Sequence, residues 1–174
     1  MKKITLLTFT ALLSLATFQT SLAQISVGGA LMYGSEVEQI GLRVDGSYAI
    51  NEDIDLNANL GFYLPDKTDL GNGNEITVTY YEFNLNGHYS LYSDDETGFS
   101  AFALAGINVL GFNSNASGPN VSGSDSDSEL GLNIGGGVSY PLSFGNLFGE
   151  LKYVIGDADQ LNIAAGVRIP LGEN

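Results

Sequence analysis

Apolar and polar residues alternate with a period of two along most of the chain after residue 24, and this pattern limits the possible folds more than any other feature. The alternation is clearest near the C-terminus. One parity carries Leu161, Ile163, Ala165, Val167, Ile169 and Leu171, and the other carries Asn162, Ala164, Gly166, Arg168 and Pro170. Successive side chains of a β-strand point to opposite faces, so strict alternation predicts half-buried strands. No helical period of comparable strength is present, and we expect an all-β chain.

Eight segments carry this alternation. They lie near residues 25–34, 37–50, 53–64, 75–92, 98–112, 128–142, 146–156 and 160–171. The facing of the fifth segment stays open, because its apolar residues occupy both parities.

The connections between the segments differ in length. Those at 50–53, 93–97 and 142–146 are short, as are 35–36 and 157–159, whereas 65–74 and 113–127 are longer and rich in Gly, Asn, Ser and Asp. Both long connections follow odd-numbered segments. In an up-and-down barrel with both termini in the periplasm, these connections lie outside the cell, where longer loops are usual. We therefore expect 65–74 and 113–127 to be extracellular loops.

The N-terminus has the organisation of a secretory signal peptide. Lys2 and Lys3 precede an apolar stretch at residues 4–18, and Ser21-Leu22-Ala23 supplies small residues at a cleavage site. The apolar stretch is short for a membrane-spanning helix of ~20 residues. We expect residues 1–23 to be removed, leaving residues 24–174 as one domain that starts at Gln24.

Charge and composition exclude several classes of protein. The chain has 6 basic and 20 acidic residues, and two of the basic ones are Lys2 and Lys3. Nucleic-acid binding requires a basic surface, which the remaining four cations cannot provide. The chain contains no cysteine, so disulfide bonds and thiolate metal sites are excluded. No residue pattern predicts a cofactor.

Aromatic residues on the apolar parity form two groups. In the topology above, one lies near the periplasmic ends of the strands and comprises Tyr48, Tyr89, Phe99 and Tyr140. The other lies near the extracellular ends and comprises Tyr33, Phe62, Tyr81 and Tyr153. Aromatic rings favour the headgroup regions of a bilayer, and aliphatic residues favour its centre. The pattern indicates two girdles around a lipid-facing surface.

The polar parity favours a barrel interior over a water-exposed face. It is rich in Gly, Asn, Ser and Ala, as expected for the narrow lumen of eight strands. Its few charges are nearly balanced, and buried charges must be paired. We predict a lumenal charge network of Arg43, Asp45, Asp55, Glu82, His88, Glu150, Lys152 and Arg168.

Catalysis is not expected. His88 is the only histidine, and a His–Ser arrangement with an acid would have to use Ser90 and Glu82. His88 is expected to face the lumen near the periplasmic end, whereas an enzyme acting on outer-leaflet lipid needs its site at the extracellular rim.

The loop acids Asp125, Asp127 and Glu129 alternate and could bind Ca²⁺ weakly, but Leu130 occupies the position where an EF-hand loop needs glycine.

Together, the signal peptide, the eight amphipathic segments, the girdles and the closing segment LNIAAGVRIPL resemble the small outer-membrane β-barrels of the OmpA/OmpX type, also described as porin-family domains. The resemblance covers the whole chain after residue 23. It implies an eight-stranded antiparallel up-and-down transmembrane barrel in the outer membrane of a Gram-negative envelope. It also implies a structural, adhesion or weak pore role, in contact with outer-membrane lipid. Such barrels commonly end in an aromatic residue, whereas this chain ends Pro170-Leu171-Gly172-Glu173-Asn174.

Our hypothesis is a barrel that acts through acidic extracellular loops at 65–74 and 113–127, where a ligand or surface would bind, and that is not a large pore. Two alternatives remain open. A secreted, soluble, lipocalin-like barrel would turn its apolar face inward around an apolar ligand. A lipid-modifying enzyme would place His88 beside Ser90 on the outer rim.

Overall fold

A computed structural model of the chain describes residues 25–119, 122–157 and 159–172, so the predicted signal peptide lies outside the described residues. The described residues form nine strands. These are β1 (Ile25–Gly34), β2 (Gln39–Ala49), β3 (Ile54–Tyr63), β4 (Asp66–Gly71), β5 (Asn74–Ser93), β6 (Ser100–Ser117), β7 (Ser122–Leu142), β8 (Gly145–Gly156) and β9 (Gln160–Pro170).

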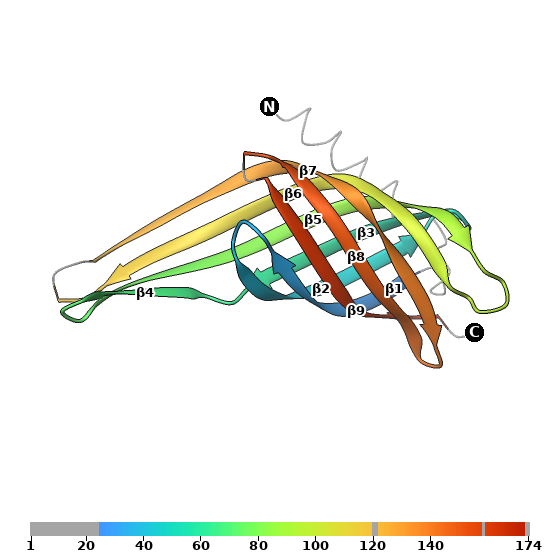
Figure 1. The fold of residues 1–174 in the computed structure, drawn as a ribbon, viewed down its shortest axis with the longest axis horizontal. Coiled ribbons are helices and arrows are strands. Elements are labelled where there is room, and N and C mark those ends of the chain that lie inside the picture. Colours follow the sequence, from blue (N-terminus) through green and yellow to red (C-terminus); the bar gives the residue numbers. More distant parts are fainter. Residues whose placement is uncertain (1–24, 120–121, 158, 173–174) are drawn as a thin grey trace, which may run out of the picture.

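Eight of the nine strands close into an antiparallel barrel, which confirms the predicted fold (Figure 1). Strands that follow one another in the chain pair with each other except β3 and β4, β1 pairs with β9, and β3 pairs with β5 to complete the ring. The backbone N–H of Leu171 donates to Ile25 O at 2.8 Å, so the two described ends of the barrel chain lie side by side. We call the end of the barrel that contains Ile25 and Leu171 the terminal end, and the opposite end of the barrel the outer end.

The two long connections are not the loops expected from the sequence. Residues 66–71 form the ninth strand, β4, and residues 113–117 and 122–127 continue β6 and β7 as a paired hairpin. In Figure 1 these segments extend together beyond the barrel. We call β4, residues 74–80 of β5, 112–117 of β6 and 122–128 of β7 the outer sheet.

The composition of these segments explains the difference. Gly71, Asn72 and Gly73 all have positive φ, between 55° and 78°, and form the turn that pairs β4 with β5. The sequence 113–127 has few apolar residues because its strands lie beyond the barrel, not because it is irregular.

The structure also fixes the facing of β6. Phe102 lines a cavity at the terminal end of the lumen, and Leu104, Asn108 and Leu110 are buried inside, whereas Ile107 is 45% exposed on the outside. Alanines occupy the outer face at positions 101, 103 and 105. Apolar residues occupy both parities because Phe102, Leu104 and Leu110 face the lumen, whereas the alanines and Ile107 face outward.

The outward face changes character along β5, β6 and β7, whose pairing runs without a bulge from the outer sheet into the barrel as far as Ser90. Phe83, Val109 and Leu130 form an apolar outward row, since Phe83 pairs with Val109 and Val109 with Leu130. Four residues further out, Thr79, Asn113 and Ser126 form a polar outward row. On β5 the inner face changes at the same height from polar residues, Glu82 and Asn84, to the largely apolar Tyr80 and Val78. We call the height at which both faces change the polarity boundary.

Candidate functional site

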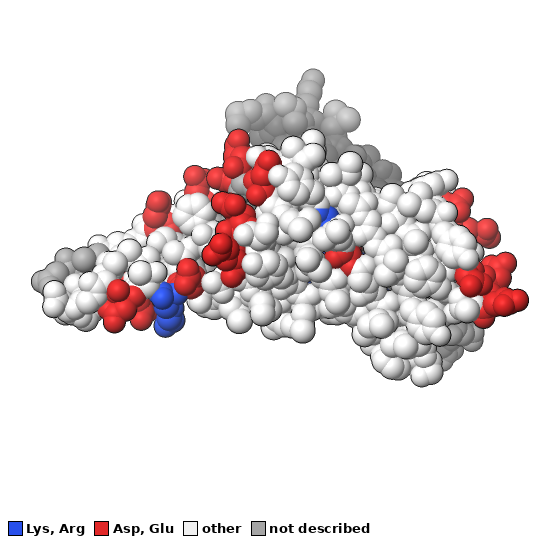
Figure 2. All heavy atoms as spheres, in the orientation of Figure 1, with Lys and Arg blue, Asp and Glu red and all other residues white. Residues whose placement is uncertain are grey.

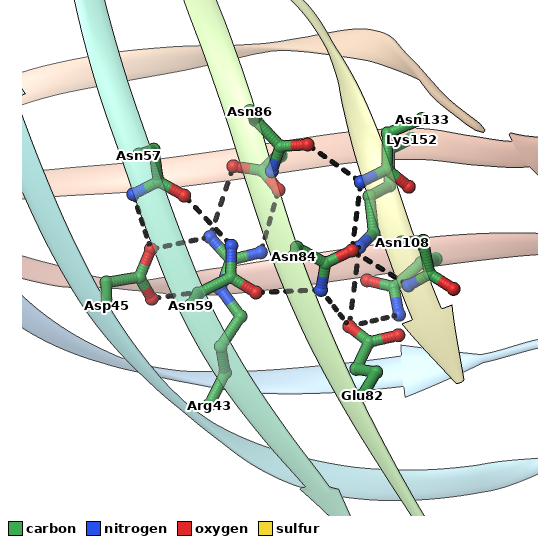
Figure 3. A network of polar contacts seen from close by, with 12 residues as sticks. Arg43, Asp45, Asn57, Asn59, Glu82, Asn84, Asn86, Asn108, Asn133 and Lys152 are labelled. Atoms are coloured by element: carbon green, nitrogen blue, oxygen red, sulfur yellow. Dashed lines mark hydrogen bonds and ion pairs between the residues drawn. The ribbon is translucent and has the colours of Figure 1, made fainter. Parts of the chain in front are cut away.

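The lumen is filled by polar side chains, and Arg43 is at the centre of one half of it. Its Nε and Nη2 each donate to Asp45 at 2.9 Å (Figure 3). Its Nη1 and Nη2 donate to Glu150 at 2.7 and 3.1 Å. The three side chains come from β2 and β8 and are 4% exposed or less. Arg43 thus holds two carboxylates in a fork geometry that only a guanidinium provides.

Arg168 of β9 completes this half. Its Nη2 lies 3.1 Å from Asp45 Oδ1 and 3.6 Å from Glu150 Oε2. Its guanidinium lies 3.9 Å from the centre of the Phe148 ring, and that of Arg43 lies 5.4 Å from the same ring. Two cations therefore share two carboxylates and one aromatic face.

The other half of the lumen is organised around Lys152. Its Nζ lies 3.3 Å from Glu82 Oε1 and donates to Asn84 Oδ1 at 2.6 Å. Asn84 Nδ2 in turn donates to Glu82 at 3.0 Å and to Asn59 at 2.9 Å. The buried ion pairs therefore join three cations to three anions, and this set of six is electrically neutral.

Buried asparagines connect the two halves. Asn57 Nδ2 lies 3.3 Å from Asp45 Oδ1, Asn59 donates to Asn57 at 2.9 Å, and Asn84 bonds Asn59. Asn108 and Asn133 donate to Asn84 at 2.8 and 2.9 Å. An amide both donates and accepts, so a chain of asparagines can link charges of opposite sign. Sequence reasoning placed several of these residues on the polar parity but did not assign them to the network.

Apolar side chains close the lumen toward the outer end. Met32, Val37, Tyr63 and Leu110 are buried together, and Tyr80 packs against them. The Tyr63 hydroxyl donates to Glu82 Oε2 at 3.2 Å and accepts from Asn162 Nδ2 at 2.8 Å, which joins this apolar plug to the polar layer below. The lumen is therefore filled by the plug above the network.

Two of the predicted network residues lie apart from the ion pairs. Asp55 is exposed at the terminal end, and no ion pair within the described ranges includes it. His88 is buried and stacks on Phe102 with 4.6 Å between the ring centres. Both line a cavity of about 240 Å³ at the terminal mouth that Arg168 also lines. Asp55 therefore lies at the mouth of the lumen, outside the buried ion pairs.

The enzyme alternative does not fit this geometry. His88 lies inside the lumen toward the terminal end, not at the outer rim, and its Nε2 has no hydrogen-bond partner among the described residues. No hydrogen bond joins it to Ser90 in the part of the chain that the structure describes. The His–Ser contact that nucleophilic catalysis requires is not formed.

The predicted girdle residues lie on the outward face. Tyr33, Phe62, Tyr81, Tyr89, Tyr140 and Tyr153 are each between 39% and 55% exposed, and Tyr48 and Phe99 are half-buried. Tyr81 lies over Gly111 of β6, so that any side chain at position 111 would collide with its ring. Between the two groups the outward residues are mainly aliphatic, among them Leu42, Val44, Leu132 and Ile134.

The acids proposed for Ca²⁺ are held apart. Asp125, Asp127 and Glu129 lie on one face of the extended strand β7, where alternate residues are separated by roughly 6.8 Å. Across the described residues, no group of three His, Cys, Asp or Glu side chains could hold a metal ion.

The described part of the chain contains no helix long and apolar enough to cross a membrane.

Acidic residues outside the lumen gather at the two ends of the molecule. Figure 2 shows one group on the left, from the protruding outer sheet to the adjoining part of the barrel, and another at the right-hand end, with a nearly uncharged band between. Glu36, Glu38, Asp157 and Asp159 lie in turns at the outer end, and Glu52, Asp53, Asp94, Asp95 and Glu96 lie in turns at the terminal end. The exterior is thus apolar in the middle and anionic at both ends.

Comparison with known proteins gives structural matches only. No family model and no curated protein sequence matches the chain. Neisserial surface protein A is 17% identical over 84% of this chain and 95% of its own, with a TM-score of 0.59. The N-terminal β-barrel domain of Pseudomonas aeruginosa OprF is 16% identical over 83% of this chain and 95% of its own, with a TM-score of 0.60.

A third similar structure is Ail, the attachment invasion locus protein of Yersinia pestis, solved in complex with the heparin analogue sucrose octasulfate. It is 18% identical over 83% of this chain and 96% of its own, with a TM-score of 0.55. At this level of identity the similarity concerns the fold. The closed eight-stranded ring, the polar lumen and these three structures together show that the chain has the fold of the small OmpA/OmpX-type outer-membrane β-barrels.

Proposed function

We propose that the chain is a non-enzymatic outer-membrane protein whose closed barrel anchors an acidic sheet outside the cell, where it interacts with cationic partners. Residues 1–23 would direct its export. The observation that carries the proposal is the inverted polarity of the barrel, with charges and amides inside and aliphatic side chains outside.

The outward face of the barrel supports a lipid environment. Leu31, Leu42 and Val44 are each about 61–62% exposed, and similar residues follow around the ring. Soluble monomers rarely expose a contiguous apolar surface of this kind, because its contact with water is unfavourable. The lipocalin-like alternative requires an apolar lumen, whereas Arg43, Lys152 and the buried asparagines and acids of the network fill this one. The structure therefore argues against that alternative.

The filled lumen supports an anchoring role over a diffusion role. Arg43, Glu82 and Lys152 are 1% exposed or less, and the apolar plug lies above them. Eight strands leave an interior that side chains just fill. A large pore would form only if these buried ion pairs separated, and their separation inside the barrel costs considerable free energy.

The sign of the exterior charge indicates the kind of partner. Ail was solved with the heparin analogue sucrose octasulfate, which is a polyanion. The acidic exterior of this chain should instead favour positively charged partners. Among the described residues of this chain, Lys67 is the one basic side chain outside the lumen network, and it lies 3.4 Å from Glu75. The outer end therefore favours basic proteins or peptides over sulfated polysaccharides.

Fractionation of cells tests the location. An outer-membrane band whose mobility on SDS gels changes upon boiling is the expected result, since closed barrels resist detergent. Sequencing of that band should start at Gln24 if residues 1–23 are cleaved. A soluble periplasmic or secreted band would contradict the proposal.

Protease added to intact cells tests the orientation. The hairpin connecting β6 and β7 should be cut from outside, and a variant with an inserted cleavage site at residues 50–53 should be protected until the outer membrane is broken. Protection of the β6–β7 hairpin together with cutting at 50–53 would mean the opposite orientation.

A further inference from the structure

A small cavity lies where the outer sheet meets the barrel mouth. It has a volume of about 190 Å³ and is lined by Glu36, Val37, Tyr80, Leu110, Phe112 and Glu129. These residues come from the β1–β2 turn and from β5, β6 and β7. The volume corresponds to about six water molecules at ~30 Å³ each, which is room for one long side chain.

The floor of the cavity is apolar and partly aromatic. Val37 and Leu110 are 8% and 7% exposed and belong to the apolar plug. Tyr80 and Phe112 pack against each other with ring centres 6.2 Å apart and planes tilted by 48°. Aromatic faces attract organic cations, and an apolar floor suits an aliphatic stem.

Glu129 gives the cavity an unsatisfied anionic group. Its Oε2 atom is buried from solvent and has no hydrogen-bond partner among the described residues. A carboxylate oxygen removed from water needs a donor, and a cationic donor serves it best. Glu36, on the β1–β2 turn, lines the same cavity and adds a second negative charge.

The described chain cannot supply that cation. Arg43, Lys152 and Arg168 are held in the lumen, and Lys67 on β4 pairs with Glu75. Lys2 and Lys3 belong to the predicted signal peptide.

From these contacts we infer that the cavity is a binding site for a single guanidinium or alkylammonium group, carried on the side chain of a basic segment of a partner protein. The cation lies between Glu36 and Glu129, and its stem lies on Tyr80 and Phe112. The inference deepens the proposed function by naming a site and a ligand class at the outer end.

Binding can be measured with the membrane-purified protein in lipid nanodiscs, so the result does not depend on location or orientation in the cell. The probe is N-acetyl-arginine methylamide, and its uncharged citrulline counterpart is the control. In protein labelled with ¹⁵N-phenylalanine and ¹⁵N-leucine, the arginine probe should shift the amide signals of Phe112 and Leu110. The citrulline probe should leave them unchanged.

Two matched pairs of variants separate a site from general charge attraction. Glu129→Gln should weaken binding about tenfold, as expected for a lost charge-assisted hydrogen bond. Asp127→Asn, which removes one charge from the same face of β7 but does not line the cavity, should change it less than about twofold. Glu36→Gln and Glu38→Gln form the second pair on the β1–β2 turn. Unchanged mobility shifts on unboiled gels confirm that all four variants fold.

Equal weakening in both members of each pair would overturn the inference, because it would reflect diffuse attraction alone. Absence of binding by wild-type protein would also overturn it, even if the protein is found in the outer membrane as proposed. Putrescine distinguishes the source of the cation. If putrescine binds more weakly than the arginine probe, the cation comes from a protein side chain. If putrescine binds more tightly, that assignment is overturned in favour of a free amine.

Discussion

Arg43 and Glu150 are 107 positions apart in the chain, and their side chains meet in the lumen through two parallel hydrogen bonds of 2.7 and 3.1 Å. The pair links β2 to β8, which are separated in the ring by β1 and β9. It therefore connects strands across the lumen that no backbone ladder joins.

Breaking this ion pair should destabilise the barrel strongly. Among the described residues, Glu150→Gln leaves Arg43 and Arg168 with Asp45 as the one carboxylate in an ion pair with them, and an uncompensated buried charge costs about 3–5 kcal/mol. The free energy of unfolding in urea, measured in lipid vesicles, provides the test. Lys67→Met is the control, because its pair with Glu75 is exposed and should contribute less than about 1 kcal/mol. Equal stability of wild type and Glu150→Gln would mean that the lumenal pair has no structural role.

Asn84 should be the most sensitive of the lumenal amides, since its side chain bonds five neighbours. These are Asn59, Glu82, Asn108, Asn133 and Lys152. Asn84→Ala leaves several buried groups without partners and should lower the free energy of unfolding by about 2–3 kcal/mol. Asn115→Ala on the exposed outer sheet should change it by less than about 0.5 kcal/mol. Similar effects of the two variants would show that the asparagine chain is not a stabilising unit.

The polarity boundary predicts the depth of the membrane. Ile134 and Ser124 share the outward face of β7, Ile134 within the apolar band and Ser124 beyond the boundary. In lipid vesicles, Ile134→Arg should destabilise the barrel by about 2–4 kcal/mol, whereas Ser124→Arg should have an effect near zero. A harmless arginine at position 134 would mean that this face does not contact lipid.

Asp125 and Asp127 should protect the open edge of the outer sheet. From Ser122 to Leu130, β7 pairs with no described residue on its β8 side. The backbone N–H groups of Ser126 and Ser128 donate to Asp125 Oδ1 at 2.9 Å and Asp127 Oδ1 at 2.7 Å. These donors are therefore unavailable to an added strand, and charge further discourages pairing.

Replacing both aspartates by serine should promote self-association, visible as dimers in analytical ultracentrifugation in detergent. The variant Asp53→Ser/Asp95→Ser loses the same charge at the terminal end and should stay monomeric. Dimers in both variants would point to net charge rather than edge protection as the cause.

The sequence was sufficient to predict the barrel because an apolar exterior and a packed polar lumen impose a strict alternation. The predicted segment 37–50, for example, corresponds to β2 at Gln39–Ala49. It was insufficient for the outer sheet, because Ser122–Ser128 are exposed beyond the apolar exterior and the packed lumen, and their pairing depends on backbone hydrogen bonds with β6. The alternation then carries no apolar signal, and such a segment cannot be distinguished from a loop.

The network was predictable in kind but not in detail. Residues of one parity had to share the lumen, which placed Arg43, Lys152 and Arg168 near carboxylates. Which charges are buried depends on depth along the barrel, and parity says nothing of depth. Asp55 has the right parity but lies at the mouth, whereas Asn84 lies at the centre and became the main connection between the charges.

The uninterrupted pairing of β5, β6 and β7 across the polarity boundary has a consequence for how such a chain can change in length. An insertion or deletion of two residues in each strand of the β6–β7 hairpin would raise or lower its tip and leave every side chain on its original side. A change of one residue within a strand would turn all the side chains between it and the next bulge or turn to the opposite side. Outer hairpins on this barrel can therefore vary in height in steps of two residues per strand, about 6.8 Å each.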